Sequence, residues 1–175
     1  SNISKALRDP RYYYDVTAVV VKKDAAPYMV EELQDAKGRE IPLNSEIQIV
    51  DFSQGRPAEI SVKNGVPVIL VCIVSEDSEG VISSIVETLE GLKTSGVNVG
   101  EKNVSMILTA GLGSRNYPMT AVTGNGNKGL LKSINGESNA RVALQQSMQF
   151  YRPDGRGVHI FEVDKIMAIS QPISR

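Results

Sequence analysis

Residues 66–74 read VPVILVCIV, an unbroken run of apolar side chains. A short apolar run of this kind is typical of a strand that is buried on both faces of a sheet. Pro67 stands near the start of the run, where a sheet tolerates a residue that lacks an N–H group. The run therefore predicts a strand at the centre of a sheet.

The residues that follow this run predict an α-helix and then a second strand. The stretch 75–78 (SEDS) contains capping and acidic residues that suit the start of a helix. Apolar residues recur at helical spacing from 81 to 92, and Gly96 ends the helix. Residues 104–109 (VSMILT) then have the composition of a strand. This spacing predicts a right-handed crossover between two parallel strands, whose C-terminal ends meet at one edge of the sheet.

Two hairpins are predicted beside the crossover. Residues 59–63 alternate polar and apolar side chains, and the sequence Asn-Gly at 64–65 is typical of a type I′ turn into the central strand. Residues 148–152 and 158–170 have the pattern of a second hairpin around the turn at 153–155 (PDG). Hairpins combined with a parallel crossover predict a mixed sheet.

The remaining periodic stretches complete a single domain. We expect a fold of the α/β or α+β class, with few helices, mainly on one face of the sheet. Residues 1–11 are polar and contain Asp-Pro, which indicates a flexible N-terminal arm, and residues 12–175 form the domain. Shorter elements are expected as a helical turn at 3–8, a strand within 12–23, a helix at 27–38 and a helix from 138 to 144. Polar and apolar residues alternate within 41–52, which predicts a half-exposed strand.

The overall charge is close to zero, because 19 basic residues stand against 20 acidic ones. No net field therefore attracts nucleic acid or acidic membranes to the whole chain. The longest apolar run is too short to span a bilayer, and it lacks the flanks of a signal peptide. We expect a soluble chain without a membrane partner, which is not secreted and lies in the cytoplasm or within an assembled particle.

The residue types that catalyse most hydrolytic reactions are scarce. Cys72 is the only cysteine and lies inside the apolar run, and His159 is the only histidine. A chain with one of each has few ways to build a zinc site or a nucleophile–base pair. The acidic residues at 76–79 are better explained by a helix start than by a metal site. The composition favours a protein that is not an enzyme, with no catalytic residue, no metal ligand and no cofactor.

Glycine and polar residues dominate the stretch after the second parallel strand. Residues 108–120 (LTAGLGSRNYPMT), followed by 128–131 (KGLL), look like the signature loop of the sugar nucleotidyltransferases. The resemblance implies that the backbone at Gly111 and Gly113 wraps a nucleotide, that Arg115 meets its triphosphate and that Lys128 steadies a phosphate. Backbone N–H groups and fixed cations are what phosphate oxygens require.

Three functions remain open at this point. The first is a non-enzymatic assembly or binding protein that associates with itself, as in a homo-oligomeric ring or a virion-type shell. The second is a phosphate- or nucleotide-binding domain that uses the segment from Gly111 to Lys128. The third is single-stranded nucleic-acid binding through tyrosines that stack on bases. The expected interaction surface consists of Tyr12, Tyr13, Tyr14, Arg115, Asn125 and Asn127.

Overall fold

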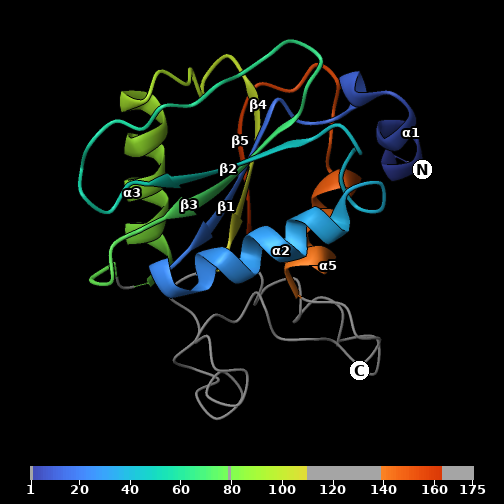
Figure 1. The fold of residues 1–175 in the computed structure, drawn as a ribbon. Coiled ribbons are helices and arrows are strands. Elements are labelled where there is room, and N and C mark those ends of the chain that lie inside the picture. Colours follow the sequence, from blue (N-terminus) through green and yellow to red (C-terminus); the bar gives the residue numbers. More distant parts are fainter. Residues whose placement is uncertain (1, 79, 110–138, 163–175) are drawn as a thin grey trace, which may run out of the picture.

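The computed structural model describes residues 2–78, 80–109 and 139–162 (Figure 1). In these residues the chain forms a five-stranded sheet with helices packed on it, which is an α/β fold. The strands are β1 (Val16–Val21), β2 (Glu46–Asp51), β3 (Val68–Ile73), β4 (Asn103–Leu108) and β5 (Gly157–Glu162). The α-helices are α1 (Asn2–Arg8), α2 (Ala26–Ala36), α3 (Gly80–Thr94) and α5 (Asn139–Gln149), and short 3-10 helices span Pro10–Tyr12 and Lys23–Ala25.

All five strands are parallel and lie in the order β2-β3-β1-β4-β5. The predicted crossover is confirmed, because β3 and β4 run parallel and α3 connects them. The two strands are not neighbours, however, since β1 lies between them and pairs with both. The central strands β1, β3 and β4 are buried along their whole length.

The first predicted hairpin is wrong. The turn at residues 64–65 forms, and Gly65 has a φ of 76°, but residues 59–63 do not pair with β3. Instead the Gln48 side-chain amide of β2 donates a hydrogen bond to the Ser61 carbonyl oxygen at 2.9 Å. Both edges of β3 are occupied by parallel strands, β1 on one side and β2 on the other, so no edge remains for residues 59–63.

The second predicted hairpin is also wrong. Residues 148–149 belong to the last turn of α5, and β5 pairs in parallel with β4, with Gly157 opposite Asn103. The turn at 153–155 is fixed by the Asn103 side chain, whose amide donates to the Arg152 carbonyl oxygen at 2.8 Å. The chain therefore enters β5 along the amino end of β4. Residues 163–170 of the predicted hairpin lie outside the described residues.

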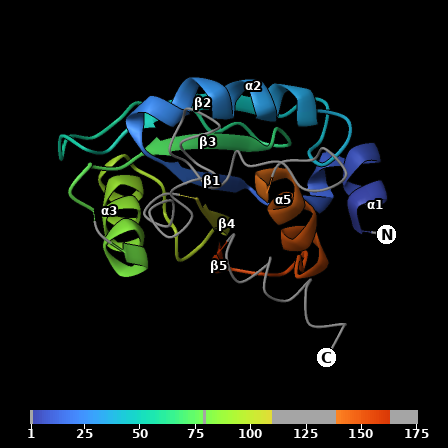
Figure 2. The ribbon, with the colours of Figure 1, turned by 90° about the horizontal axis from the view of Figure 1, so that it is seen from below.

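Helices cover both faces of the sheet. α2 and α5 share one apolar core with residues such as Val19, Val71 and Ile107. On the other face Leu92 of α3 packs in a second core that includes Cys72. Figure 2 shows α3 and α5 on opposite sides of the sheet. We call these the α2/α5 face and the α3 face.

A buried arginine ties α5 to α2. The Arg141 guanidinium donates to Glu40 and to Asp35, each at 2.6 Å, and lies 3.6 Å from Glu32. At the amino-terminal end of the chain, α1 occupies the segment expected to be an arm, and its Ala6 is buried in the core of the α2/α5 face. No helix in the described part of the chain is long and apolar enough to cross a membrane.

Candidate functional site

Two of the three tyrosines predicted to form an interaction surface are buried. Tyr13 is 4% exposed and Tyr14 is 0% exposed. The Tyr14 hydroxyl donates to the Ser147 carbonyl oxygen at 2.7 Å, and its ring packs edge-on against Tyr151 at a centroid distance of 5.3 Å. Burial raises the pKa of both Tyr13 and Tyr14. Of the three, only Tyr12 reaches the surface, and its ring lies 4.1 Å from the Lys5 ammonium group.

The prediction of a tyrosine surface is therefore wrong for Tyr13 and Tyr14. An aromatic run next to a strand can pack on a neighbouring helix or face solvent, and here α5 covers it. A stacking platform for bases needs exposed ring faces. The other predicted site residues lie outside the described residues: Gly111, Gly113, Arg115, Asn125, Asn127 and Lys128.

The carboxyl ends of β1 and β3 carry a polar network. The Lys22 ammonium group donates to the carbonyl oxygens of Ser75 at 2.7 Å and Ser78 at 2.9 Å. The Glu87 carboxylate accepts from the Ser75 amide at 2.8 Å and from the Ser78 hydroxyl at 2.6 Å. These contacts fix the turn between β3 and α3. The network has a structural role, because the lysine and the glutamate both bind the chain itself.

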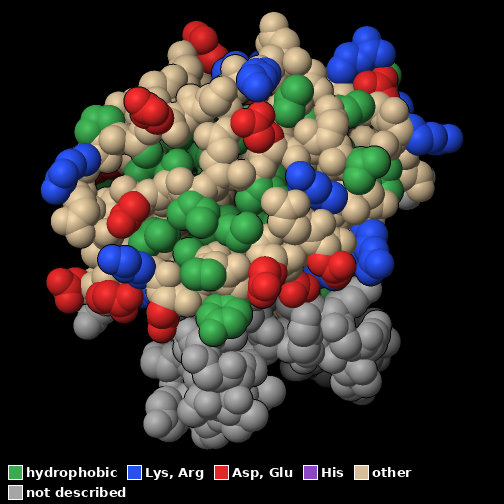
Figure 3. Space-filling view, in the orientation of Figure 1, with side chains coloured by type: hydrophobic (Ala, Val, Ile, Leu, Met, Phe, Trp, Pro, Cys, Tyr) green, Lys and Arg blue, Asp and Glu red, His purple; other side chains and the backbone are tan. Residues whose placement is uncertain are grey.

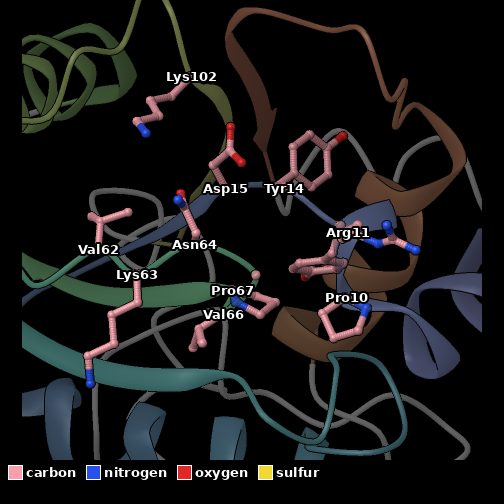
Figure 4. A pocket seen from close by; sticks show the side chains of 12 residues that line it. Pro10, Arg11, Tyr14, Asp15, Val62, Lys63, Asn64, Val66, Pro67 and Lys102 are labelled. Carbon is pink, nitrogen blue, oxygen red and sulfur yellow. The ribbon is translucent and has the colours of Figure 1, made fainter.

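The amino ends of the strands surround a pocket of about 230 Å³. Figure 4 shows Lys102, Asp15 and Asn64 around it. The Asp15 carboxylate accepts a hydrogen bond from the backbone N–H of Asn103 at 2.9 Å. Lys63, which also lines the pocket, lies 3.9 Å from Glu46. The sequence alone does not predict this pocket, because residues 10–15 and 62–67 come together only in the folded chain. Its size suits a small solute, and the lining holds no histidine, cysteine or serine.

The single histidine does not form a catalytic pair in the described residues. His159 of β5 is the register neighbour of Ser105 in β4. The Ser105 hydroxyl and the His159 Nδ1 atom are both buried without a hydrogen-bond partner. A serine becomes a nucleophile through a hydrogen bond to its base, and this contact is missing here. The described residues also contain no cluster of three or more His, Cys, Asp or Glu side chains that could hold a metal ion.

The two outer strands of the described sheet are its most exposed strands. Ile49 of β2 is 52% exposed and Ile160 of β5 is 42% exposed. Figure 3 shows hydrophobic side chains gathered over β2 and the adjoining flank of α2, with charged side chains around them. Next to β5, Phe150 is 61% exposed and its ring lies 5.9 Å from that of Phe161. Unpaired strands with exposed apolar side chains are surfaces to which another strand can bind.

The described residues form a parallel α/β domain in which β2 and β5 are the outer strands of the sheet. Comparisons of the chain with models of protein families, with curated proteins and with solved structures found no match.

Proposed function

We propose that this chain is a non-enzymatic assembly protein whose copies associate through the outer strands β2 and β5. The observation that carries the proposal is the exposure of a large aliphatic side chain, Ile49 or Ile160, in the middle of each outer strand. Natural proteins usually protect such edges with charges, proline or a covering segment. Charges stand only at the ends of β2, at Glu46 and Asp51.

The position of the two edges suggests the form of the assembly. β2 and β5 are the strands at the two opposite edges of the sheet, and they differ in sequence. A contact between them therefore joins one edge of a copy to the other edge of the next copy. Interfaces of this head-to-tail type close into rings when the rotation between copies allows it and otherwise extend as filaments. This agrees with the ring or shell expected from the sequence.

The test is light scattering of the intact chain over a range of micromolar concentrations. We expect a mass that rises above 19.0 kDa with concentration. Ile49→Lys places a charge in the contact and shifts the equilibrium towards the monomer. Ile82→Lys is the matched control, because Ile82 is 76% exposed but lies on α3. A strict monomer at every concentration, or an equal effect of both variants, would contradict the proposal.

A second proposal is that residues 111–128 bind a phosphate or nucleotide. It is supported by topology, because β4 ends at Leu108 beside the carboxyl end of β1. Open parallel α/β sheets bind their ligands at this edge. We expect nucleoside triphosphate with magnesium to raise the melting temperature, since ligand at a hundred times its Kd adds about 2.7 kcal/mol of stability. Arg115→Ala should abolish the shift, and no shift with any nucleotide would overturn this proposal.

A further inference from the structure

We propose that β2 of one copy pairs in parallel with β5 of the next copy in a single register, with Glu46 opposite Arg156. This inference rests on the proposed function and specifies its interface. The occupant of each outer strand is a second copy of the chain. Two properties of the two strands support it: the direction of their backbone groups, which also sets the faces of their side chains, and the positions of their charges.

The backbone groups of the two strands are complementary. The amides of Glu46 and Phe52 donate to β3 residues Pro67 and Ile73, each at 2.9 Å, so the even-numbered backbone groups of β2 point inward. The backbone groups of Ile47, Ile49 and Asp51 therefore point away from the sheet. They have no partner among the described residues.

The backbone groups of β5 also point alternately towards the sheet and away from it. The Gly157 amide donates to the Lys102 carbonyl oxygen of the chain leading into β4 at 2.8 Å. The odd-numbered groups of β5 thus point inward, and those of Val158 and Ile160 point outward. In a parallel pair, the N–H and C=O groups of a residue that points towards the partner strand do not bond to the residue directly opposite. They bond to the two residues on either side of it. Ile49 of β2 can therefore face an odd-numbered residue of β5, such as His159.

The side-chain faces agree with this pairing. Ile47 of β2 and Phe161 of β5 both pack on the core of the α2/α5 face. Val50 and Val158 both pack on the core of the α3 face. Pairing odd residues with odd residues keeps each side chain on its own face across the contact, whereas a slip by one residue would reverse every side chain. The sheet can then continue from copy to copy without a break in either layer.

Several registers place odd-numbered residues opposite odd-numbered residues, and the positions of the charged side chains favour one of them. With Ile49 opposite His159, Glu46 faces Arg156, which is an exposed cation next to the start of β5. A slip by two residues in one direction would place Glu46 opposite Asp154, where two acids repel each other. A slip by two in the other direction would place it opposite Val158 and lose the ion pair. Among the described residues of one copy, the ion pair of Glu46 is a long contact of 3.9 Å to Lys63.

Cysteine cross-linking tests the register directly. Glu46→Cys and Arg156→Cys chains, both in a Cys72→Ala background, are mixed at a concentration at which light scattering shows assembly. The mixture is then oxidised mildly. Opposite residues of paired strands lie within the reach of a disulfide, whereas residues two positions away do not. We expect a disulfide-linked dimer in this mixture. The matched control mixes Glu46→Cys with Asp154→Cys, and we expect at least tenfold less cross-linked product.

The outcomes separate this inference from the proposed function. If the chain assembles but Glu46→Cys links only to itself or to Asp154→Cys, the register is wrong while assembly stands. If the chain is a monomer at every concentration, both proposals fail. If the 46–156 product dominates, both are supported.

A charge exchange provides a second readout that does not depend on disulfide geometry. We expect Arg156→Glu to weaken association by at least about fivefold, because losing an ion pair worth about 1 kcal/mol accounts for that factor and the new repulsion adds to it. Glu46→Lys combined with Arg156→Glu in one chain should restore association. A double variant that associates no better than Arg156→Glu alone would contradict the predicted pair.

Discussion

β2 and β3 are adjacent strands of equal length, yet they are built differently. β3 reads VILVCI and all its residues are buried, whereas β2 reads EIQIVD and only Val50 is buried. Ile49 is 52% exposed, while Val71, its register partner in β3, is 0% exposed. The difference shows that the composition of a strand depends on how many neighbours it has. β3 pairs with a strand on each edge, whereas β2 pairs with only one strand among the described residues.

The largest loss of stability is expected when the buried Arg141 is replaced, and the exposed Arg39 provides the comparison. Arg141 is buried between three carboxylates, and Arg39 is an exposed arginine 3.9 Å from Asp35. Arg141→Met should lower the free energy of unfolding by about 3–5 kcal/mol, because Glu40 stays buried without its partner. Arg39→Met should cost less than about 1 kcal/mol. Urea denaturation measures both, and equal losses would contradict the comparison.

Substituting isoleucines in the two adjacent strands tests the comparison itself. Ile69 of β3 is fully buried, and Ile69→Ala should cost about 2–5 kcal/mol through lost contacts and a cavity. Ile49→Ala in β2 makes the same chemical change at an exposed site and should cost less than about 0.5 kcal/mol in the monomer. Both values come from denaturation at low concentration. A loss above 2 kcal/mol for Ile49→Ala would mean that β2 is complete within one copy.

A smaller effect is expected where the chain leaves β2 and packs on the α3 face. A Cβ atom at Gly91 of α3 would lie 2.3 Å from the Phe52 ring. Gly91→Ala should therefore cost about 1–3 kcal/mol by overpacking, and adding Phe52→Leu should recover part of this loss. Gly100→Ala is the control, because the nearest atom would be 3.7 Å away. Thermal denaturation of the three variants measures the order, and a stable Gly91→Ala would show that Phe52 has room to move.

The smallest effect is chemical and leaves stability unchanged. Cys72 lies in β3, and burial raises the pKa of its thiol. We expect no reaction with a thiol reagent at pH 8 in the native protein and full reaction in denaturant. Ile49→Cys in a Cys72→Ala background should react at once in the monomer. Rapid labelling of native Cys72 would contradict the assignment of β3 to the centre of the sheet.

The sequence predicted local elements well and strand partners badly. The apolar run at 66–74, the helical periodicity from 81 and the alternation within 41–52 led to β3, α3 and a half-exposed β2, because each signal is contained in a few consecutive residues. The partner of a strand is not local. A turn such as Asn64-Gly65 forms in a hairpin and in a loop alike, so it could not exclude the parallel arrangement.

The candidate site was harder to predict for the same reason. Tyr13 and Tyr14 have the composition of a binding surface, but α5, which arrives from far along the chain, covers them. The outer edges of β2 and β5 become visible only when the strand order is known. Alternation in β2 indicated exposure on one face, but it could not show that β2 is an outer strand of the described sheet.

Amide hydrogen exchange resolved by residue is the most direct test of the central claim, that β2 and β5 bind each other between copies. The amides of Ile49 and Ile160 point outward and should exchange rapidly in dilute solution, whereas that of Val50 points to β3 and should exchange slowly throughout. At concentrations at which the chain assembles, we expect exchange at Ile49 and Ile160 to slow at least tenfold, with Val50 unchanged. Fast exchange at both outward amides in the assembled protein would contradict the account.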